Sequence, residues 1–164
     1  MGPDGKMYSR MLGGNLVRID VENARGENLT NGDLVGTKDG SAYGLVFDPQ
    51  DENVFYFSNN DKHCIYKYDL RTKECACWAG QEGKSGYLDG PIGQAMFNKP
   101  GQMCVDSEGN IILTDTENHC IRKITMSTGY VSTLAGKPQN SGYVNGSAED
   151  AQFKKPLGIC IDND

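Results

Sequence analysis

The segment AMFNKPGQMCVD at residues 95–106 returns 56 residues later as AQFKKPLGICID at residues 151–162. When the comparison is extended upstream, residues 63–106 align with residues 119–162 without a gap, and 17 of the 44 positions are identical. Internal repeats of about 50 residues are typical of solenoids and propellers. Within each repeat, short runs of strand-forming residues alternate with turn residues, which predicts four strands per unit. The sequence therefore indicates an all-β fold, a β-propeller of four-stranded antiparallel blades.

We expect one partial propeller over residues 1–164, with about three blades of a six-bladed ring. The predicted blades lie at about 4–40, 41–98 and 99–154, and a further blade starts at 155–164. The first blade lacks its innermost strand, and residues 158–162 form the innermost strand of the further blade. Predicted strands lie at 6–9, 15–20 and 33–36 in the first blade, at 43–48, 53–58, 64–69 and 74–80 in the second, and at 102–106, 110–115, 120–124 and 130–136 in the third.

Three blades cannot close a ring, because each open blade face would leave apolar surface in water. We therefore expect the chain to be a fragment of a longer propeller. The alternative is a head-to-tail homodimer, in which two copies supply six blades and each terminal inner strand completes the first blade of the other copy.

The composition is that of a globular protein, with a net charge of -6 and a pI of about 4.9. Nucleic-acid partners are not expected, because a phosphate-binding surface needs clustered Lys and Arg. No apolar run approaches the ~20 residues of a transmembrane helix. The six Cys lack the paired spacings of a zinc site, so we interpret them as small buried hydrophobic residues. Their redox state is left open.

Residues 97–136 resemble an NHL repeat, through Phe97-Asn98-Lys99-Pro100, then Asp115-Thr116-Glu117-Asn118-His119, then Val131-Ser132-Thr133-Leu134-Ala135-Gly136. The second blade departs from this pattern at residues 59–63, and the first blade is only weakly similar. The longer insert at residues 86–90 is similar to that of NHL modules in Bacteroides-type envelope proteins, where the propeller follows an IPT/TIG domain. This resemblance implies export to the periplasm or cell surface, a localisation that the residues themselves do not show.

Function is expected on the face of the propeller that carries the long loops, because binding residues concentrate on loops held by a rigid scaffold. These loops span residues 59–63 and 81–100 and, one repeat later, 115–119 and 137–156. The candidate ligand-binding residues on this face are His63, Tyr87, Asp89, Lys99, Asp115, His119, Tyr143, Asn145, Lys154 and Lys155.

Each candidate has a structural interpretation as well. His63 and His119 recur once per blade and are expected to hydrogen-bond a neighbouring loop, with a functional role as the alternative. Phe97 and Phe153 are expected to pack as plugs between adjacent blades. Asp48, Asp106 and Asp162 end the innermost strands and are expected to cap their own turns, with a channel cation as the alternative.

The function predicted first is a non-enzymatic scaffold that presents the long-loop face to a protein or glycan, with no cofactor and no metal. The alternative is a lyase or hydrolase that uses a cation in the propeller channel. Two His at the axis are one way to hold such a cation, as in the propeller lyase that cleaves α-hydroxyglycine peptides. The sequence contains neither a Gly-x-Ser-x-Gly motif nor a phosphate-binding loop.

Overall fold

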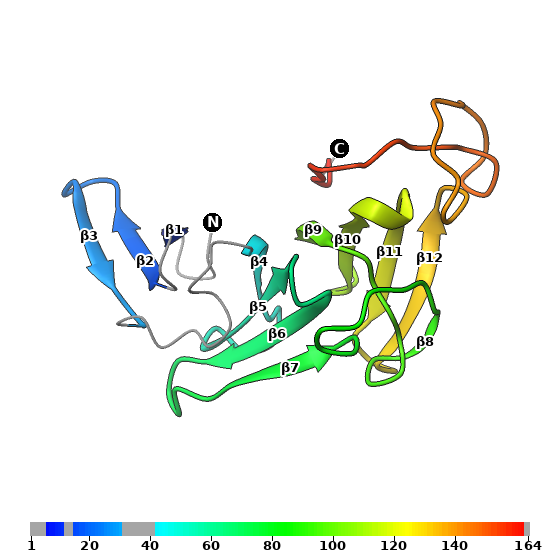
Figure 1. Ribbon diagram of the computed structural model, residues 1–164. Coiled ribbons are helices and arrows are strands. Elements are labelled where there is room, and N and C mark those ends of the chain that lie inside the picture. The colour runs from blue at the N-terminus through cyan, green and yellow to red at the C-terminus, as the bar shows by residue number, and fades with distance from the viewer. Residues whose placement is uncertain (1–5, 12–14, 31–41, 163–164) are drawn as a thin grey trace.

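The computed structural model describes residues 6–11, 15–30 and 42–162, and it shows three antiparallel sheets that fan out in an arc (Figure 1). Their strands are β1 (Met7–Met11), β2 (Asn15–Asp20) and β3 (Arg25–Asn28) in the first sheet, β4 (Ala42–Phe47), β5 (Val54–Asn59), β6 (Cys64–Asp69) and β7 (Cys75–Ala79) in the second, and β8 (Gly90–Pro91), β9 (Pro100–Val105), β10 (Ile111–Asp115), β11 (Cys120–Thr125) and β12 (Tyr130–Ala135) in the third. The helical element of the described chain is a single 3-10 turn, η1 (Thr116–Asn118). The described residues include no helix long and apolar enough to cross a membrane.

The second and third blades confirm the predicted four-stranded meanders. Their strands follow the order β4-β5-β6-β7 and β9-β10-β11-β12, each paired antiparallel with its neighbour along the chain. The third sheet has a fifth strand that the sequence did not predict. In it, Gly90 and Pro91 pair with Val131 and Tyr130 of β12. The connection between the second and third blades therefore covers the outer edge of the third blade, an edge that would otherwise be open to pairing.

The first blade differs in one strand from the prediction. Its outermost described strand is β3, which pairs with β2 from Val17 to Asp20, whereas the predicted outer strand at 33–36 lies outside the described residues. β3 is exposed at all four positions, so it lacks the apolar alternation on which the sequence-based prediction depended.

The second blade supplies the centre of the apolar core because β5 is buried along its whole length, as its continuous apolar run predicted. Phe55 and Phe57 face the first blade, where they cluster with Leu16 of β2. Val54 and Tyr56 face the third blade, in a cluster with side chains such as Leu113. Each side of the β5 strand thus joins one pair of neighbouring blades.

The innermost strands approach each other closely, and glycine makes this approach possible. A Cβ atom on Gly44 of β4 would lie 2.7 Å from the carbonyl oxygen of Gly101 in β9. The hydroxyl of Ser58 bridges the two strands, since it accepts from Gly44 N at 2.8 Å and donates to Gly101 O at 2.7 Å. One repeat later Thr114 Oγ1 donates to Leu157 O at 3.2 Å.

The segment after Leu157 differs from the prediction of an innermost strand at 158–162. Residues 158–162 form no strand ladder within the described chain. A strand is defined by its pairing, and the partner expected here is the second strand of a following blade. Leu157 itself nevertheless occupies the place next to β9 that Gly101 occupies next to β4, since its carbonyl accepts from Gln102 N at 3.4 Å.

Candidate functional site

The starts of the innermost strands and the loops beside them enclose a hollow of 470 Å³ on the long-loop face, which we name the axial mouth. These segments meet because β4 and β9 lie side by side at the inside of the fan, where Figure 1 also places the C-terminal segment. Residues from five separate parts of the chain line the axial mouth: Tyr43, Asn60, Lys99, Gly101, Gln102, Thr116, Glu117, Lys155, Leu157 and Gly158.

Two lysines of the axial mouth occupy equivalent positions in successive repeats, and each is fixed by a histidine. His63 Nδ1 accepts a hydrogen bond from Lys99 N at 3.1 Å, and His119 Nδ1 accepts one from Lys155 N, also at 3.1 Å. Both lysines have positive φ, 55° for Lys99 and 51° for Lys155. The hydrogen bond expected between each histidine and a neighbouring loop is thus present in both repeats, and it sets the backbone from which each lysine side chain extends.

The other lining groups are an aromatic ring and several polar side chains. The Tyr43 side chain is 65% exposed and presents its ring at the rim. Asn60, Gln102 and Thr116 add amide and hydroxyl groups, while Lys155 Nζ lies 2.9 Å from the Glu117 carboxylate. The axial mouth therefore combines an aromatic ring, neutral hydrogen-bonding groups, and side chains of positive and negative charge.

The hydrogen bond to His63 Nδ1 requires a neutral imidazole, so we predict a pH-dependent contribution to stability. Burial, and to a lesser extent the Lys99 charge, lowers the pKa of His63. The folded state then binds fewer protons than the unfolded state, so this stability is present above the unfolded pKa of about 6.5 and is lost as the pH falls through it and through the lower folded pKa. The melting temperature should therefore fall between about pH 7.5 and pH 5.

The matched variant is His63→Asn, because Asn tolerates the positive φ of 55° at this position and removes the imidazole acceptor. At pH 7.5 we expect it to lower the free energy of unfolding by about 1 kcal/mol. The difference in melting temperature between wild type and variant should shrink toward pH 5. A difference that stays constant over this range would contradict the role of the neutral imidazole.

The most buried charged cluster lies next to the axial mouth and is centred on Arg122 of β11. This side chain is 0% exposed, and its guanidinium donates to Asp115 and Asp89, each at 2.7 Å. It also donates to the carbonyl oxygens of Met96 at 3.1 Å and Leu88 at 2.9 Å. Burial raises the pKa of Asp115, an effect that the Arg122 charge opposes. Arg122 therefore ties the connection at residues 81–99 to the third blade.

Arg122 was not among the predicted site residues, although the sequence contains a signal for it. β11 alternates between buried and half-buried residues, and Arg122 falls in the buried phase together with Cys120 and Ile124. A charged residue in the apolar phase of a strand indicates a buried ion pair. Its partner Asp115 was a candidate ligand-binding residue, but its carboxylate also accepts from Asn98 N and Asn118 Nδ2, each at 2.8 Å.

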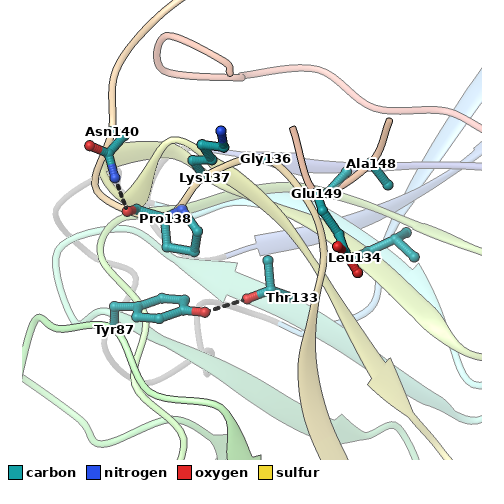
Figure 2. Close-up of a pocket in the computed structure, with 10 residues that line it drawn as sticks. Tyr87, Thr133, Leu134, Gly136, Lys137, Pro138, Asn140, Ala148 and Glu149 are labelled. Carbon is teal, nitrogen blue, oxygen red and sulfur yellow. Dashed lines mark hydrogen bonds between the residues drawn. The ribbon is translucent and has the colours of Figure 1, made fainter. Parts of the chain in front are cut away.

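Tyr87 and Asp89, two further candidates, contact Arg122 as well. The guanidinium of Arg122 lies 4.9 Å from the centre of the Tyr87 ring, and the Tyr87 hydroxyl is 2.7 Å from Thr133 Oγ1. Asp89 accepts from Thr133 N at 3.1 Å. Figure 2 shows the Tyr87–Thr133 contact at one side of a separate pocket of 440 Å³, with Pro138 and Lys137 across from it. The polar atoms of both candidates are thus engaged in joining the connection to β12.

Tyr143 and Asn145 lie away from the axial mouth, beside a third hollow of 690 Å³. The Tyr143 side chain is 84% exposed, and Lys154 Nζ lies 5.9 Å from the centre of its ring. The structure therefore does not gather the predicted candidates into one site. It places Lys99 and Lys155 in the axial mouth and fixes their backbones through His63 and His119. Asp115 is buried at the end of β10, and the remaining candidates lie in the connections that follow β7 and β12.

The aspartates at the ends of two innermost strands cap their own turns, as expected. Asp48 accepts from Gln50 N at 2.9 Å and from the Tyr56 hydroxyl at 2.7 Å. Burial alone would raise the pKa of Asp106, but hydrogen bonds from Asn110 and the ammonium of Lys123 lower it to about 2. The described residues contain no group of three or more His, Cys, Asp or Glu side chains arranged to hold a metal ion.

The six cysteines are all free thiols. Cys64 and Cys120 are buried, as their interpretation as small apolar residues predicted, and burial raises the pKa of the Cys120 thiol to about 12. Cys160 is exposed and Cys75, Cys77 and Cys104 are intermediate, so the interpretation holds fully for only two of the six.

Comparison with known proteins finds similarity to proteins that contain NHL repeats. Residues 97–124 match the NHL repeat. NHL repeat-containing protein 2 from Bos taurus is 29% identical over 104 residues, which cover 63% of this chain and 14% of the relative. The chain thus spans about a seventh of the length of that curated relative.

Two solved structures resemble the chain over nearly its whole length. A protein of unknown function from Bacteroides thetaiotaomicron superposes with a TM-score of 0.85 at 28% identity, over 96% of this chain and 39% of that one. An auxiliary nutrient binding protein from the same organism superposes with a TM-score of 0.74 at 27% identity, over 98% of this chain and 41% of that one. The chain thus contains a segment at residues 97–124 that matches the NHL repeat, and it shares its β-propeller fold with these solved structures.

Proposed function

We propose that this chain is a non-enzymatic binding module that presents the long-loop face of its propeller to a protein or glycan. The observation that carries the proposal is the axial mouth, a hollow of 470 Å³ lined by an exposed aromatic ring, amides, a hydroxyl and charged side chains. Concave sites with a few convergent polar groups are the usual location of ligand binding.

The scaffold around the axial mouth supports this proposal. Thr116 Oγ1 donates to Pro156 O at 2.9 Å, and Glu117 N donates to Asn98 O at 3.0 Å, so the η1 loop is fixed to both neighbouring connections. A preformed site avoids the cost of ordering loops when a ligand binds. The resemblance to an auxiliary nutrient binding protein at 27% identity is a further point in favour of binding, because that protein shares the fold over 98% of this chain.

The proposal is tested by screening the purified protein against a polysaccharide panel and a peptide array, with the Tyr43→Ala variant beside the wild type. Tyr43→Ala removes the exposed ring of the axial mouth and should weaken binding of any ligand found by at least about tenfold. The matched control is Tyr130→Ala, which removes a ring that is 47% exposed on β12, outside the axial mouth. Equal affinities of the two variants would place the binding site elsewhere, and turnover of a bound compound would favour the alternative of a lyase or hydrolase.

A further inference from the structure

The charge of the axial mouth is opposite in sign to that of the chain. The chain has a net charge of -6, yet the lining of the mouth contains two lysines and one carboxylate. One lysine, Lys155, is paired with that carboxylate, Glu117, at 2.9 Å. A local excess of positive charge attracts an anionic ligand, whereas the acidic remainder of the protein surface repels it.

The lysines are placed by the fold and do not merely lie on a solvated surface. Lys99 and Lys155 occupy the same position in successive repeats, and each has its backbone N–H bound by a histidine in the preceding blade. The backbone of both lysines is held in the left-handed region, with φ of 55° and 51°. Non-glycine residues seldom adopt this conformation, so its recurrence shows that the two repeats fix the backbone of both lysines in the same way, at positions that line the axial mouth.

The neighbours of these lysines favour a carbohydrate over a peptide. The exposed Tyr43 ring offers a flat apolar face of the kind on which the C–H face of a sugar packs. Gln102 and Asn60 line the same hollow, and their amide groups both donate and accept, which suits hydroxyl groups. β9 is the edge strand of its sheet, but Gly101 O accepts from Ser58 Oγ and Gln102 N donates to Leu157 O, so the part of this edge that lines the axial mouth is not free to pair with an extended peptide.

We propose that the axial mouth binds an acidic carbohydrate, a saccharide whose carboxylate is held by Lys99 and Lys155 while its ring packs on Tyr43. This inference rests on the proposed function and specifies its ligand class. An ammonium group recognises a carboxylate as a point charge, without the fixed geometry of an arginine pair. Binding should therefore weaken with added salt, because the lysines are exposed to a solvent whose Debye length is about 8 Å at physiological ionic strength.

The test is isothermal titration of the wild-type protein with oligogalacturonate, oligoguluronate and hyaluronan tetrasaccharide. Methyl-esterified oligogalacturonate serves as the neutral control, because it keeps every ring and hydroxyl and loses the charge. We expect at least one acidic saccharide to bind at least about tenfold more tightly than its neutral counterpart. The double variant Lys99→Gln with Lys155→Gln should remove this preference, whereas Lys67→Gln, on exposed β6 surface, should retain it.

A second variant is expected to raise the affinity for the acidic saccharide, an effect that a loss of folding could not produce. Glu117→Gln frees Lys155 from its ion pair and should raise the affinity for the acidic saccharide by up to about fivefold. Equal binding of acidic and neutral saccharides would overturn the acidic ligand class and leave the proposed function standing. Binding of a hexaglutamate peptide alone would overturn the carbohydrate class, and failure of saccharides and peptides alike would overturn both proposals.

Discussion

Replacing Arg122 with Met is expected to lower the free energy of unfolding by about 3–5 kcal/mol. The variant leaves the carboxylate of Asp115, which is 0% exposed, without its charged partner, and it removes the donors to the Leu88 and Met96 carbonyls. Urea unfolding at constant pH measures the loss. Burial already raises the pKa of Asp115, and loss of the opposing Arg122 charge raises it further. Stability present at low pH is therefore lost as the pH rises, and the deficit should be larger at pH 8 than at pH 5.

The second blade provides the control for this prediction. Its residues equivalent to Arg122 and Asp115 are Tyr66 and Asn59, a neutral pair that is also buried. The double variant Arg122→Tyr with Asp115→Asn copies that pair into the third blade and should recover about 1–3 kcal/mol relative to the sum of the single changes. If the free-energy losses of the two single variants simply added up in the double variant, an unpaired buried charge would not be the cause of the loss.

Replacing Phe97 with Ala is expected to cost about 3–5 kcal/mol, because its ring fills the space between the second and third blades. Phe97 is 0% exposed and belongs to the same apolar cluster as Ala95 and Leu113. Its ring contacts Gly80, where a Cβ atom would lie 2.9 Å away, and it stacks 5.1 Å from the Arg122 guanidinium. The variant therefore leaves a cavity bordered by a buried charge, and chemical denaturation should report the full loss.

Phe153 is the matched control, since it is the same residue one repeat later and meets Gly136 in the same way, at 2.8 Å from a built Cβ. Its side chain is only half-buried. Phe153→Ala should thus cost clearly less than Phe97→Ala, in proportion to the smaller apolar area that it buries. Equal losses in the two variants would mean that Phe97 does not act as the plug between blades.

The strands were predictable because their signals are local. Residues 54–59 and 111–115 are apolar runs bounded by turns, and the repeat at residues 63–106 and 119–162 aligned the weaker segments with the stronger ones. β3 and β8 were missed because they lack such a local signal. β3 is exposed throughout, and β8 is a strand of two residues whose only cause is its pairing with β12.

The candidate site was predictable only as a face of the propeller. The repeat indicated that Lys99 and His63 matter to each unit, but it could not separate residues that face the axis from residues that join blades. Tyr87 and Asp89 share the long loops with Lys99, and their side chains turn to Arg122 and Thr133 because burial of the guanidinium demands carboxylate and carbonyl partners.

An all-β propeller is predictable from the amino-acid sequence alone, since strand alternation, turn residues and a 56-residue repeat can be recognised without knowledge of the fold. That Tyr43, Lys99, Glu117 and Lys155 line one hollow is visible only in the folded chain, because they lie up to 112 residues apart in the sequence. The physical reason is the packing of the innermost strands. Gly44 lets β9 approach β4, and the Ser58 hydroxyl bridges the two strands. The loops beside these strands therefore lie close together at the axial mouth.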